Sequence, residues 1–336
     1  MKVPDSLQPQ DHASMVSALE RYADNPSAFL ALNRGNEYFT FTGIEGFICY
    51  RPHGRRWIQF GGPFTGEPGR RELQSRFLEH AHRKGRRVVG VQLQREDAEL
   101  FAELGLTVNQ VGASYAVELT DFSLRGKRFV RLRNKISRAQ RAGLEVSAVD
   151  AEADAVAGEI ADIDARWLRE KGKHTKELTF LIGEIGGPWQ PLRKLFVGRI
   201  DGAAIGYVSY APVYGSRPGW LHDLSRRLPD CPPGVMEAIN SHAIDHVRAL
   251  GAPWLHFGFT PFTGLDEAHR LPTASRAATR MIRLIAEHGD RVYPAKSQLE
   301  YKSKWYPNAV LPEYFAFDGG ISPRSLWSVV RATNIL

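Results

Sequence analysis

The sequence is poor in cysteine and in long apolar runs. Its 336 residues include two cysteines, Cys49 and Cys231, which lie far apart and match neither a disulfide framework nor a paired metal-ligand motif. No run approaches the roughly 18 apolar residues that a membrane-spanning helix needs. The opening residues MKVPDSLQPQDH lack the apolar core of a signal peptide. We therefore expect two unpaired thiols, no metal site, no transmembrane segment and a cytoplasmic location.

The remaining composition is that of a folded, basic protein. With 43% hydrophobic and 10% aromatic residues, the chain can bury one large core, or two cores of roughly 150 residues each. The net charge of +7 and the isoelectric point near 9.4 favour polyanionic partners such as nucleic acid or an acidic lipid surface. A basic soluble enzyme without such a partner fits the same charge.

The first half of the chain alternates between helix-like and strand-like patterns. Helical spacing of apolar residues predicts helices over Asp11–Ala23, Arg70–Lys84 and Glu96–Leu104. Alternating patterns and a His53-Gly54 turn predict strands over Tyr38–Phe41, Gly46–Arg51, Arg55–Phe60, Arg87–Leu93, near Thr107 and over Tyr115–Leu119. We expect Gly61–Gly69 to be a connecting loop. This order predicts an α/β (α+β) fold in which helices cover a mixed sheet.

Arg87-Val-Val-Gly90 superficially resembles the pyrophosphate loop of acetyl-CoA-dependent acetyltransferases. It falls inside a predicted strand, however, and not at a strand-to-helix turn, where free amides and the helix dipole can hold phosphate. We therefore expect no acetyl-CoA site at this position.

The densest charge cluster lies near the middle of the chain. RGKRFVRLRNKISRAQR contains no acid and carries the cations Arg125, Lys127, Arg128, Arg131, Arg133, Lys135, Arg138 and Arg141. One stripe of this helix can pack, because apolar residues recur at helical spacing, at Phe129, Leu132, Ile136 and Ala139. The other faces can neutralise phosphates without reading a base sequence. A solvated charged face has the same pattern.

The composition changes abruptly after this basic helix. Gly143 is expected to end the helix by adopting a left-handed conformation. The following stretch, AVDAEADAVAGEIADIDA, is acidic and rich in alanine. We therefore predict two domains, residues 1–145, which include the basic helix, and residues 146–336.

The second half repeats the alternation of elements. A helix is predicted over Ala153–Glu170, and a hairpin with the type I′ turn signal Asp201-Gly202 joins strands over Leu195–Ile200 and Ala204–Pro212. The intervening REKGKHTKE is a basic loop, which either contacts a polyanion or is solvated through Lys171, Lys173 and Lys176.

Residues 220–265 combine polar residues with a clear element pattern. An apolar strand carries Asp223 and Arg226 to a proline-broken turn, a helix follows over Pro233–Leu250, and a second strand covers Trp254–Phe259. This is a strand-helix-strand unit, and we expect its two polar ends to lie on one rim of the sheet.

Four motifs resemble one known family. They are LRGKRFVRLRNKISRAQRAGLEV, HDLSRRLPDCPPGVMEAI, FGFTPFTGL and LEYKSKWYPNAVLPEYFAF, and together they span most of the chain in order. They are similar to the catalytic domain of lysylphosphatidylglycerol synthases, the multiple peptide resistance factor family. The resemblance implies a tandem pair of acetyltransferase-like (GNAT) folds, the second related to Fem-type aminoacyl transferases, and aminoacyl-tRNA as co-substrate in place of acyl-CoA.

The resemblance also implies an activity. Members of this family transfer lysine or alanine from charged tRNA to the glycerol hydroxyl of phosphatidylglycerol, and others act on small amines, hydroxylamines or sterols. The expected partners are therefore aminoacyl-tRNA and an anionic phospholipid or small-molecule acceptor, with peripheral contact at the inner face of the membrane. An aminoacyl ester is already activated, so its transfer requires alignment and a cation near the oxyanion but no metal or cofactor.

The sequence departs from the family near the expected acceptor site. Where lipid-acting members have Asn-Phe-Gln-Gly-Leu, this chain has Pro294-Ala-Lys-Ser-Gln298, and Phe262 replaces a leucine in the turn. The amino acid and the acceptor therefore stay open. The C-terminal RSLWSVVRATNIL has the pattern of a basic amphipathic helix, which either rests on an anionic membrane or covers the sheet.

The family motifs assign roles to particular residues. Asp223 is expected to hold the ammonium of the aminoacyl group, and Arg226 a phosphate of the tRNA end or of a lipid; a local Asp-Arg ion pair is the structural alternative. Strand alternation in YKSKW would place Lys302 and Lys304 on one face, with Lys302 stabilising an oxyanion or phosphate. The expected substrate- or tRNA-binding residues are Arg128, Arg131, Arg133, Lys135, Arg138, Lys171, Lys173, Gly258, Pro261, Asp290 and Tyr293.

Two further points are left open by the sequence. His222 and His256 flank the helix of residues 233–250 and could carry a proton, although a histidine on a strand is more often part of the core. A CoA-dependent acetyltransferase and a non-catalytic binder of RNA or membranes are the competing functional hypotheses.

Overall fold

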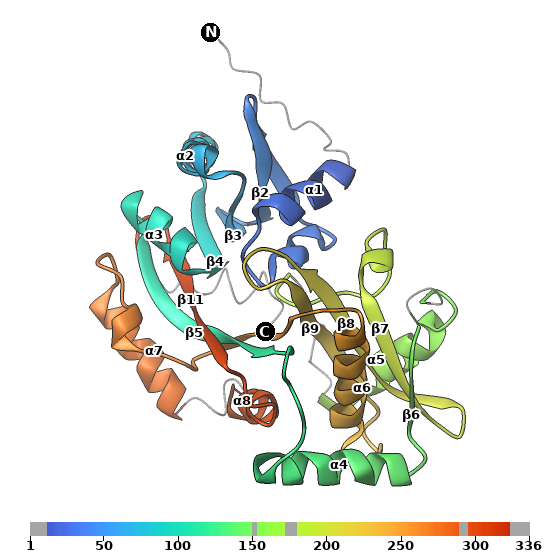
Figure 1. Cartoon of the computed structure of the whole chain (residues 1–336). Helices are drawn as coiled ribbons and strands as arrows, with labels where there is room; N and C mark the ends of the chain where they lie inside the picture. The colour runs from blue at the N-terminus through green and yellow to red at the C-terminus, as the bar shows by residue number, and fades with distance from the viewer. Residues whose placement is uncertain (1–11, 150–152, 172–179, 289–294, 323–336) are drawn as a thin grey trace.

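The computed structural model describes residues 12–149, 153–171, 180–288 and 295–322. Within them, one 11-stranded mixed sheet has the order β1-β2-β3-β4-β11-β5-β10-β9-β8-β7-β6 (Figure 1). The strands are β1 (Glu37–Phe41), β2 (Ile44–His53), β3 (Arg56–Phe64), β4 (Arg87–Leu93), β5 (Thr107–Glu118), β6 (Glu145–Ala148), β7 (Lys194–Ile200), β8 (Ala203–Val213), β9 (Gly219–Arg227), β10 (Trp254–Pro261) and β11 (Ala309–Phe317).

Helices cover both faces of this sheet. They are α1 (His12–Tyr22), α2 (Glu67–Arg83), α3 (Arg95–Glu103), α4 (Val130–Arg141), α5 (Ala157–Lys171), α6 (Val235–Ala249), α7 (Arg276–His288) and α8 (Ala295–Ser303). The short 3-10 helix η1 (Ala28–Leu32) packs with α1 and α5 on one face, whereas α2, α3, α4 and α6 pack on the other. Within the described residues, no helix has the length and apolar character needed to cross a bilayer.

The N-terminal half (β1–β5) and the C-terminal half (β6–β11) are built in the same way. In the first, β1–β3 form an antiparallel meander, and α2 then leads to β4, which lies parallel to β3. In the second, β6, which precedes α5, pairs antiparallel with β7, β7–β9 form the meander, and α6 leads to β10, parallel to β9. A parallel pair needs a crossover of this kind, because a tight turn can only reverse the chain.

The two halves share their central strands. β11, the last strand of the C-terminal half, lies between β4 and β5 of the N-terminal half. β5 in turn pairs with β10 of the C-terminal half. The hydrogen bonds of the sheet are therefore continuous across the junction between the halves (Figure 1).

Most predicted elements agree with the structure. The strand Arg87–Leu93 is confirmed as β4, and Asp201 and Gly202 have φ of 50° and 80°, as a type I′ turn requires. The prediction of a loop over Gly61–Gly69 is wrong at both ends. β3 continues to Phe64, and α2 begins at Glu67, because Pro68 is well suited to the first helical turn.

The parallel strands β9 and β10 separate partway along their length. They pair from Gly219–Trp254 to Leu221–His256, and beyond that point β10 continues beside β5 while β9 continues beside β8. This separation opens the sheet next to Asp223.

Candidate functional site

A bulge in β9 orients Asp223 and Arg226. Tyr210 of β8 pairs with His222 and Ser209 pairs with Leu224, so Asp223 is an extra residue in β9. Residues three apart on a regular strand face opposite sides of a sheet, but an inserted residue shifts the alternation. Both side chains therefore point to the face that carries η1 and α5. β9 extends through both residues, so they lie within the strand that leads to the proline-broken turn.

The Asp223 carboxylate is enclosed. Its side chain is 1% exposed, and Nε of Arg193, itself 0% exposed, lies 3.9 Å from Oδ2. Burial raises the pKa of Asp223 to about 6, although Arg193 and the backbone amide of Gly183 act in the opposite direction. Asp223 is therefore ionised at neutral pH.

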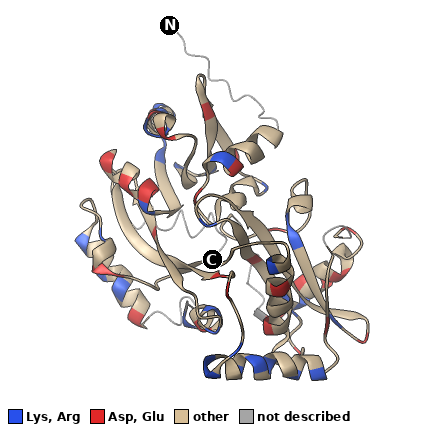
Figure 2. Ribbon diagram, in the orientation of Figure 1, with Lys and Arg blue, Asp and Glu red and all other residues tan. Residues whose placement is uncertain are grey.

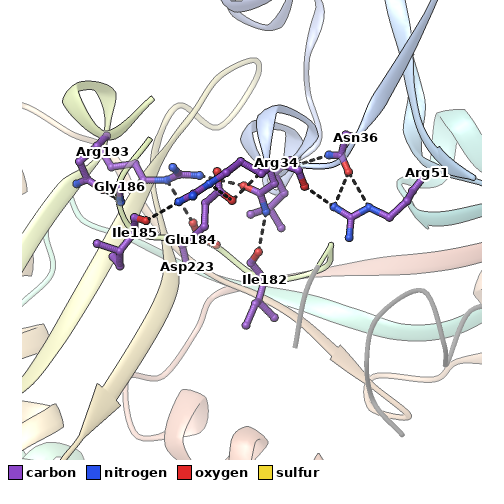
Figure 3. A network of polar contacts seen from close by, with 12 residues as sticks. Arg34, Asn36, Arg51, Ile182, Glu184, Ile185, Gly186, Arg193 and Asp223 are labelled. Carbon is purple, nitrogen blue, oxygen red and sulfur yellow. Dashed lines mark hydrogen bonds and ion pairs between the residues drawn. The ribbon is translucent and has the colours of Figure 1, made fainter. Parts of the chain in front are cut away.

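Residues from both halves surround this carboxylate (Figure 3). Arg193 Nη2 donates to Asn33 Oδ1 at 3.0 Å, and Asn33 Nδ2 donates to the carbonyl of Ile182 at 2.7 Å. Asn33 follows η1 in the N-terminal half, whereas Ile182 and Arg193 precede β7 in the C-terminal half. The Asp223 site is therefore assembled at the junction of the halves.

A second set of contacts in Figure 3 holds the chain segment of residues 180–187 against the N-terminal half. The Arg34 amide donates to Glu184 Oε2 at 3.2 Å, and Arg34 Nη2 donates to the carbonyl of Ile185 at 3.1 Å. Arg51 Nη2 donates to the carbonyl of Arg34 at 2.7 Å. These contacts place Gly183 directly against Asp223.

Arg226 and Asp223 have different ion-pair partners. Its Nη1 lies 2.9 Å from Asp164 Oδ2, its guanidinium lies 5.1 Å from the centre of the Trp167 ring, and its side chain is 2% exposed. Asp164 also accepts a hydrogen bond from Tyr207 at 2.6 Å. A local ion pair between Asp223 and Arg226, the structural alternative, is thus not the arrangement observed.

Lys302 lies in a helix, so its prediction as a strand residue is wrong. Tyr301 and Trp305 are four residues apart and both pack into the core around α6, which is a helical spacing. Lys302 is consequently buried at the end of α8, and Lys304, which follows the helix, points to a different partner. The two lysines do not share a face.

All three donors of the Lys302 ammonium are in use. Nζ donates to the carbonyls of Gly258 and Phe259 at 2.7 and 3.1 Å and to Thr260 Oγ1 at 2.6 Å. These residues lie where β10 has left β9, and Gly258 adopts a φ of 65° at a bulge. Lys302 thus holds the separated end of β10, and an ammonium has no fourth donor.

A buried acid accompanies Lys302. Glu313 of β11 accepts a hydrogen bond from Ser114 of β5, and its side chain is wholly buried. Burial raises the pKa of Glu313 and lowers that of Lys302, and the attraction between the two groups opposes both shifts. A buried base of α8 and a buried acid of β11 thus lie near each other beside the central strands that the two halves share.

Glu237 of α6 connects Lys304 with the basic helix α4. Its Oε1 lies 2.9 Å from Lys304 Nζ and 3.2 Å from Lys135 Nζ. Glu237 is 6% exposed, and the two lysines together hold its pKa below the ordinary value. Lys135, expected to bind substrate or tRNA, and Lys304, expected to be catalytic, are therefore both engaged in ion pairs with Glu237.

The other cations of α4 differ in whether their side chains have partners within the protein. Cations follow one another along α4 (Figure 2). Arg133 Nη1 donates to the carbonyls of Leu124 and Gly126. Arg131 and Arg138 are exposed and have no side-chain partner among the described residues. Leu132, Ile136 and Ala139 are buried, which confirms the predicted apolar stripe.

A hollow of about 460 Å3 lies between α4 and α8. Its lining includes the cations Arg128, Arg131, Lys296 and Lys304. The guanidinium of Arg128 lies 5.2 Å from the centre of the exposed Tyr306 ring. A cationic hollow with an exposed aromatic ring can bind phosphate and stack a base.

The remaining predicted residues have varied positions. Pro261 is the last residue of β10 and pairs with Gly112 of β5. Lys171 is the last residue of α5. Lys173, Asp290, Tyr293 and the C-terminal RSLWSVVRATNIL segment lie outside the described residues.

The two histidines are neutral at physiological pH. His222 Nδ1 lies 3.1 Å from Asn240 Oδ1, which also accepts from Tyr210, so the histidine proton is on Nδ1. His256 Nε2 donates to the carbonyl of Arg217 at 2.9 Å. Burial lowers the pKa of each histidine to about 4.

Sequence reasoning missed several residues of the site. Glu313 could have been recognised from the sequence as a candidate site residue, since it is a lone acid inside an apolar strand. Glu237 likewise lies on the buried side of its helix. Nothing in the sequence marks Arg193 and Asn33, because their importance depends on contacts between distant segments. No cluster of three or more potential metal ligands occurs among the described residues.

Comparison with known proteins identifies this architecture. The fold and the site define an α/β protein in which helices flank a mixed sheet, as the sequence predicts, and in which two similarly built halves share that one sheet. The chain belongs to the family described as phosphatidylglycerol lysyltransferase, C-terminal, whose model matches residues 16–317. The resemblance noted from the four motifs is thereby confirmed.

Two solved structures share the fold. One is the C-terminal domain (DUF2156) of a putative lysylphosphatidylglycerol synthetase from Agrobacterium fabrum, with a TM-score of 0.76, 24% identity and coverage of 96% of this chain and 94% of that one. The other is L-PGS from Bacillus licheniformis, with a TM-score of 0.77, 20% identity and coverage of 96% and 97%. At these identities the likeness establishes the fold alone.

Two curated relatives carry the same name. A phosphatidylglycerol lysyltransferase from Staphylococcus aureus (strain COL) is 22% identical over 292 residues, which is 86% of this chain. Another from Bacillus subtilis (strain 168) is 25% identical over 280 residues, which is 80% of this chain. The chain spans about a third of the length of these relatives, 34% and 31% respectively.

Proposed function

We propose that the protein is an aminoacyltransferase, which moves an amino acid of the lysine or alanine type from charged tRNA to the hydroxyl of phosphatidylglycerol or a related acceptor. The relatives named phosphatidylglycerol lysyltransferase support the transferase class and the anionic phospholipid. Transfer to a small amine or hydroxylamine is the alternative acceptor chemistry, since Pro294-Ala-Lys-Ser-Gln298 and Phe262 depart from the lipid-acting pattern.

The observation that carries the proposal is the bulged end of β9. It presents a buried, ionised Asp223 at the point where β9 leaves β10. A buried carboxylate is suited to an ammonium group, which every aminoacyl ester has, and water exclusion strengthens that attraction. In this proposal, Asp223 binds the ammonium of the donor. Arg226, whose guanidinium is paired with Asp164, orients the wall of the site next to Asp223.

The basic surface of α4 supports the tRNA part of the proposal. Arg131 and Arg138 are exposed, and Arg128 lines the hollow beside Tyr306. Phosphate contacts of this kind provide affinity that depends on salt and not on base sequence, which suits a protein that recognises the acylated end of a tRNA. Lys135 and Arg133 instead hold the helix in place.

The strand-to-helix turn between β9 and α6 offers little to acetyl-CoA. The turn from β9 to α6 contains Pro229, Pro232 and Pro233, which have no amide hydrogen to donate. The carbonyl of Lys135 in α4 lies against Gly234 at the start of α6, so the α4 backbone covers this helix N-terminus. A pyrophosphate needs free amides there, and the acyl-CoA hypothesis is therefore disfavoured.

A transfer assay tests the proposed function. Purified protein is incubated with labelled aminoacyl-tRNAs, and phosphatidylglycerol vesicles or small amines are supplied in separate reactions. We expect label to pass to one acceptor class, and the product to be lost when the tRNA is digested with RNase beforehand. Failure to transfer label from any of the aminoacyl-tRNAs to any acceptor contradicts the proposal.

A further inference from the structure

A group of buried polar atoms without hydrogen-bond partners lies at the Asp223 site. Among the described residues, these atoms include Arg193 Nε and Nη1, Asp223 Oδ2 and Glu184 Oε1. Buried polar atoms in folded proteins almost always have a partner, and exceptions cluster at functional sites. Arg193 Nε and Asp223 Oδ2 lie close to each other without forming a hydrogen bond, and such a donor and acceptor can be satisfied together by a ligand that offers both an acceptor and a donor.

The two charged groups are held apart. Arg193 Nε and Asp223 Oδ2 are separated by 3.9 Å, which is longer than a hydrogen bond. Arg193 cannot swing closer without losing its bond to Asn33 at 3.0 Å and its stacking on Phe29, whose ring centre is 5.1 Å from the guanidinium. The protein thus presents a fixed donor and a fixed acceptor side by side (Figure 3).

We propose that Arg193 and Asp223 together bind the α-aminoacyl group of the donor: Asp223 Oδ2 accepts from the ammonium, and Arg193 donates to the acyl oxygen. The ammonium and the acyl oxygen of an aminoacyl ester are carried by neighbouring carbon atoms, so they can meet two protein groups that lie side by side. This inference rests on the proposed function and adds a second residue and a substrate requirement, a free α-amine.

Arg193 then supplies the cation at the reacting carbonyl. In the transfer, the acceptor oxygen or nitrogen bonds to the acyl carbon, and the carbonyl electron pair moves onto the oxygen held by Arg193. The pair returns as the bond to the ribose oxygen breaks, and the proton released by the acceptor ends on that ribose hydroxyl. Lys302 cannot take this role in the observed arrangement, because its three donors are occupied.

The segment of residues 180–187 encloses the pair. A Cβ built on Gly183 would lie 2.0 Å from Asp223 Oδ2, so only glycine lets the backbone approach this closely. Gly186 and Gly187, with φ of 79° and 78°, follow in the same segment. Entry of an aminoacyl group therefore requires this segment to move off β9, and its return excludes water from the carbonyl.

The test compares Arg193→Gln with Arg199→Gln, a control on β7 whose guanidinium is paired with Glu159 and which contacts neither Asp223 nor the segment of residues 180–187. We expect Arg193→Gln to lower kcat by about 10²–10³-fold, Arg193→Lys to recover part of the loss, and the affinity for tRNA to stay unchanged. Arg199→Gln should keep most of kcat. Activity of Arg193→Gln within about threefold of the wild type overturns the inference, as does an equal loss in both variants at equal thermal stability.

A second readout separates this inference from the proposed function. Calorimetry measures binding of amino-acid methyl esters and of their N-acetyl derivatives to the whole protein. We expect the esters of the accepted amino acids to bind, and both N-acetylation and Arg193→Gln to abolish binding. Such binding without any transfer from tRNA rejects the proposed function and leaves the site standing. Efficient transfer of N-acetylaminoacyl groups rejects the site and leaves tRNA-dependent transfer standing.

Discussion

At the scale of single residues, the ionisation of Asp223 sets a limit on activity. Burial raises the pKa of this carboxyl to about 6, with Arg193 and the Gly183 amide opposing the shift. Below that pH the carboxyl is protonated and neutral, so it no longer attracts an ammonium. We expect kcat/KM for aminoacyl transfer to fall about tenfold per pH unit below about pH 6. Asp223→Asn should have low activity without this acid limb, and a wild-type profile that stays flat down to about pH 5 contradicts the assignment.

The buried pair of Lys302 and Glu313 gives a prediction about stability. Removing one member leaves the other buried with only its hydrogen bonds, and removing Lys302 also leaves three buried acceptors without their donor, which costs about 1–3 kcal/mol. We expect Lys302→Met and Glu313→Gln each to lower the free energy of unfolding by about 1–3 kcal/mol, and the double variant by about 1–2 kcal/mol less than the sum. Urea denaturation at neutral pH measures these differences.

Lys304 provides the matched control for that experiment. Its side chain is 31% exposed and pairs with Glu237 near the surface, where an ion pair contributes about 1 kcal/mol or less. Lys304→Met should therefore cost much less than Lys302→Met. Equal losses in the two variants would show that Lys302 has no special structural role.

The same residues show how far sequence can specify a site. Asp223 and Arg226 were singled out by type and spacing, but their common orientation depends on a bulge that pairing with β8 creates. YKSKW alternates like a strand, and the competing four-residue spacing of Tyr301 and Trp305 is decided by their burial against α6. Arg193 could not be found, because its contacts join segments that are far apart in the chain.

At the scale of elements, α4 has a face that packs and a face that remains available. Arg131 and Arg138 have no side-chain partner among the described residues, and Lys135 is held by Glu237. If α4 contacts tRNA, Arg131→Ala with Arg138→Ala should weaken binding at low salt. It should also lower the slope of log affinity against log salt by about 1.4–1.8, since each lost phosphate contact contributes about 0.7–0.9.

Filter binding across a salt series measures this slope. Arg55→Ala is the matched control, because Arg55 is also exposed and without a side-chain partner in the described part of the chain, but lies in the hairpin between β2 and β3. We expect that control to leave the slope unchanged. An equal decrease for the control and the double variant would assign the tRNA affinity to net charge alone and contradict the role of α4.

The elements themselves were largely predictable, and their partners were not. The strand-helix-strand unit around α6 is confirmed, since hydrophobic period and turn residues are local signals. The place of β11 between β4 and β5 carries no such signal. It results from pairing between strands that are about 190 to 230 residues apart, for which the periodicity of a single sequence contains no information.

At the scale of the whole molecule, the shared strands make the two halves interdependent. Separating the chain at residue 145 would leave β5 with neither of its neighbours, β10 and β11, and would leave β4 without β11. Strands exposed in this way present unpaired amides and carbonyls and promote aggregation. Each half would also lose part of its core, because Ala113, Tyr115 and Val117 of β5 pack in the same cluster as α6.

We therefore expect residues 1–145 and residues 146–336 to be insoluble or unfolded when each is produced alone, and to give soluble protein when produced together. The intact chain should unfold in one calorimetric transition, with equal calorimetric and van't Hoff enthalpies. A chain that ends before Ala309 tests the cause, since it lacks β11 and opens the sheet between β4 and β5. Two separate transitions, or a half that folds alone with protected β5 amides in hydrogen exchange, would contradict this interdependence. The Asp223 site, built from Asn33 on one side and Arg193 on the other, would then also have to form without a continuous sheet behind it.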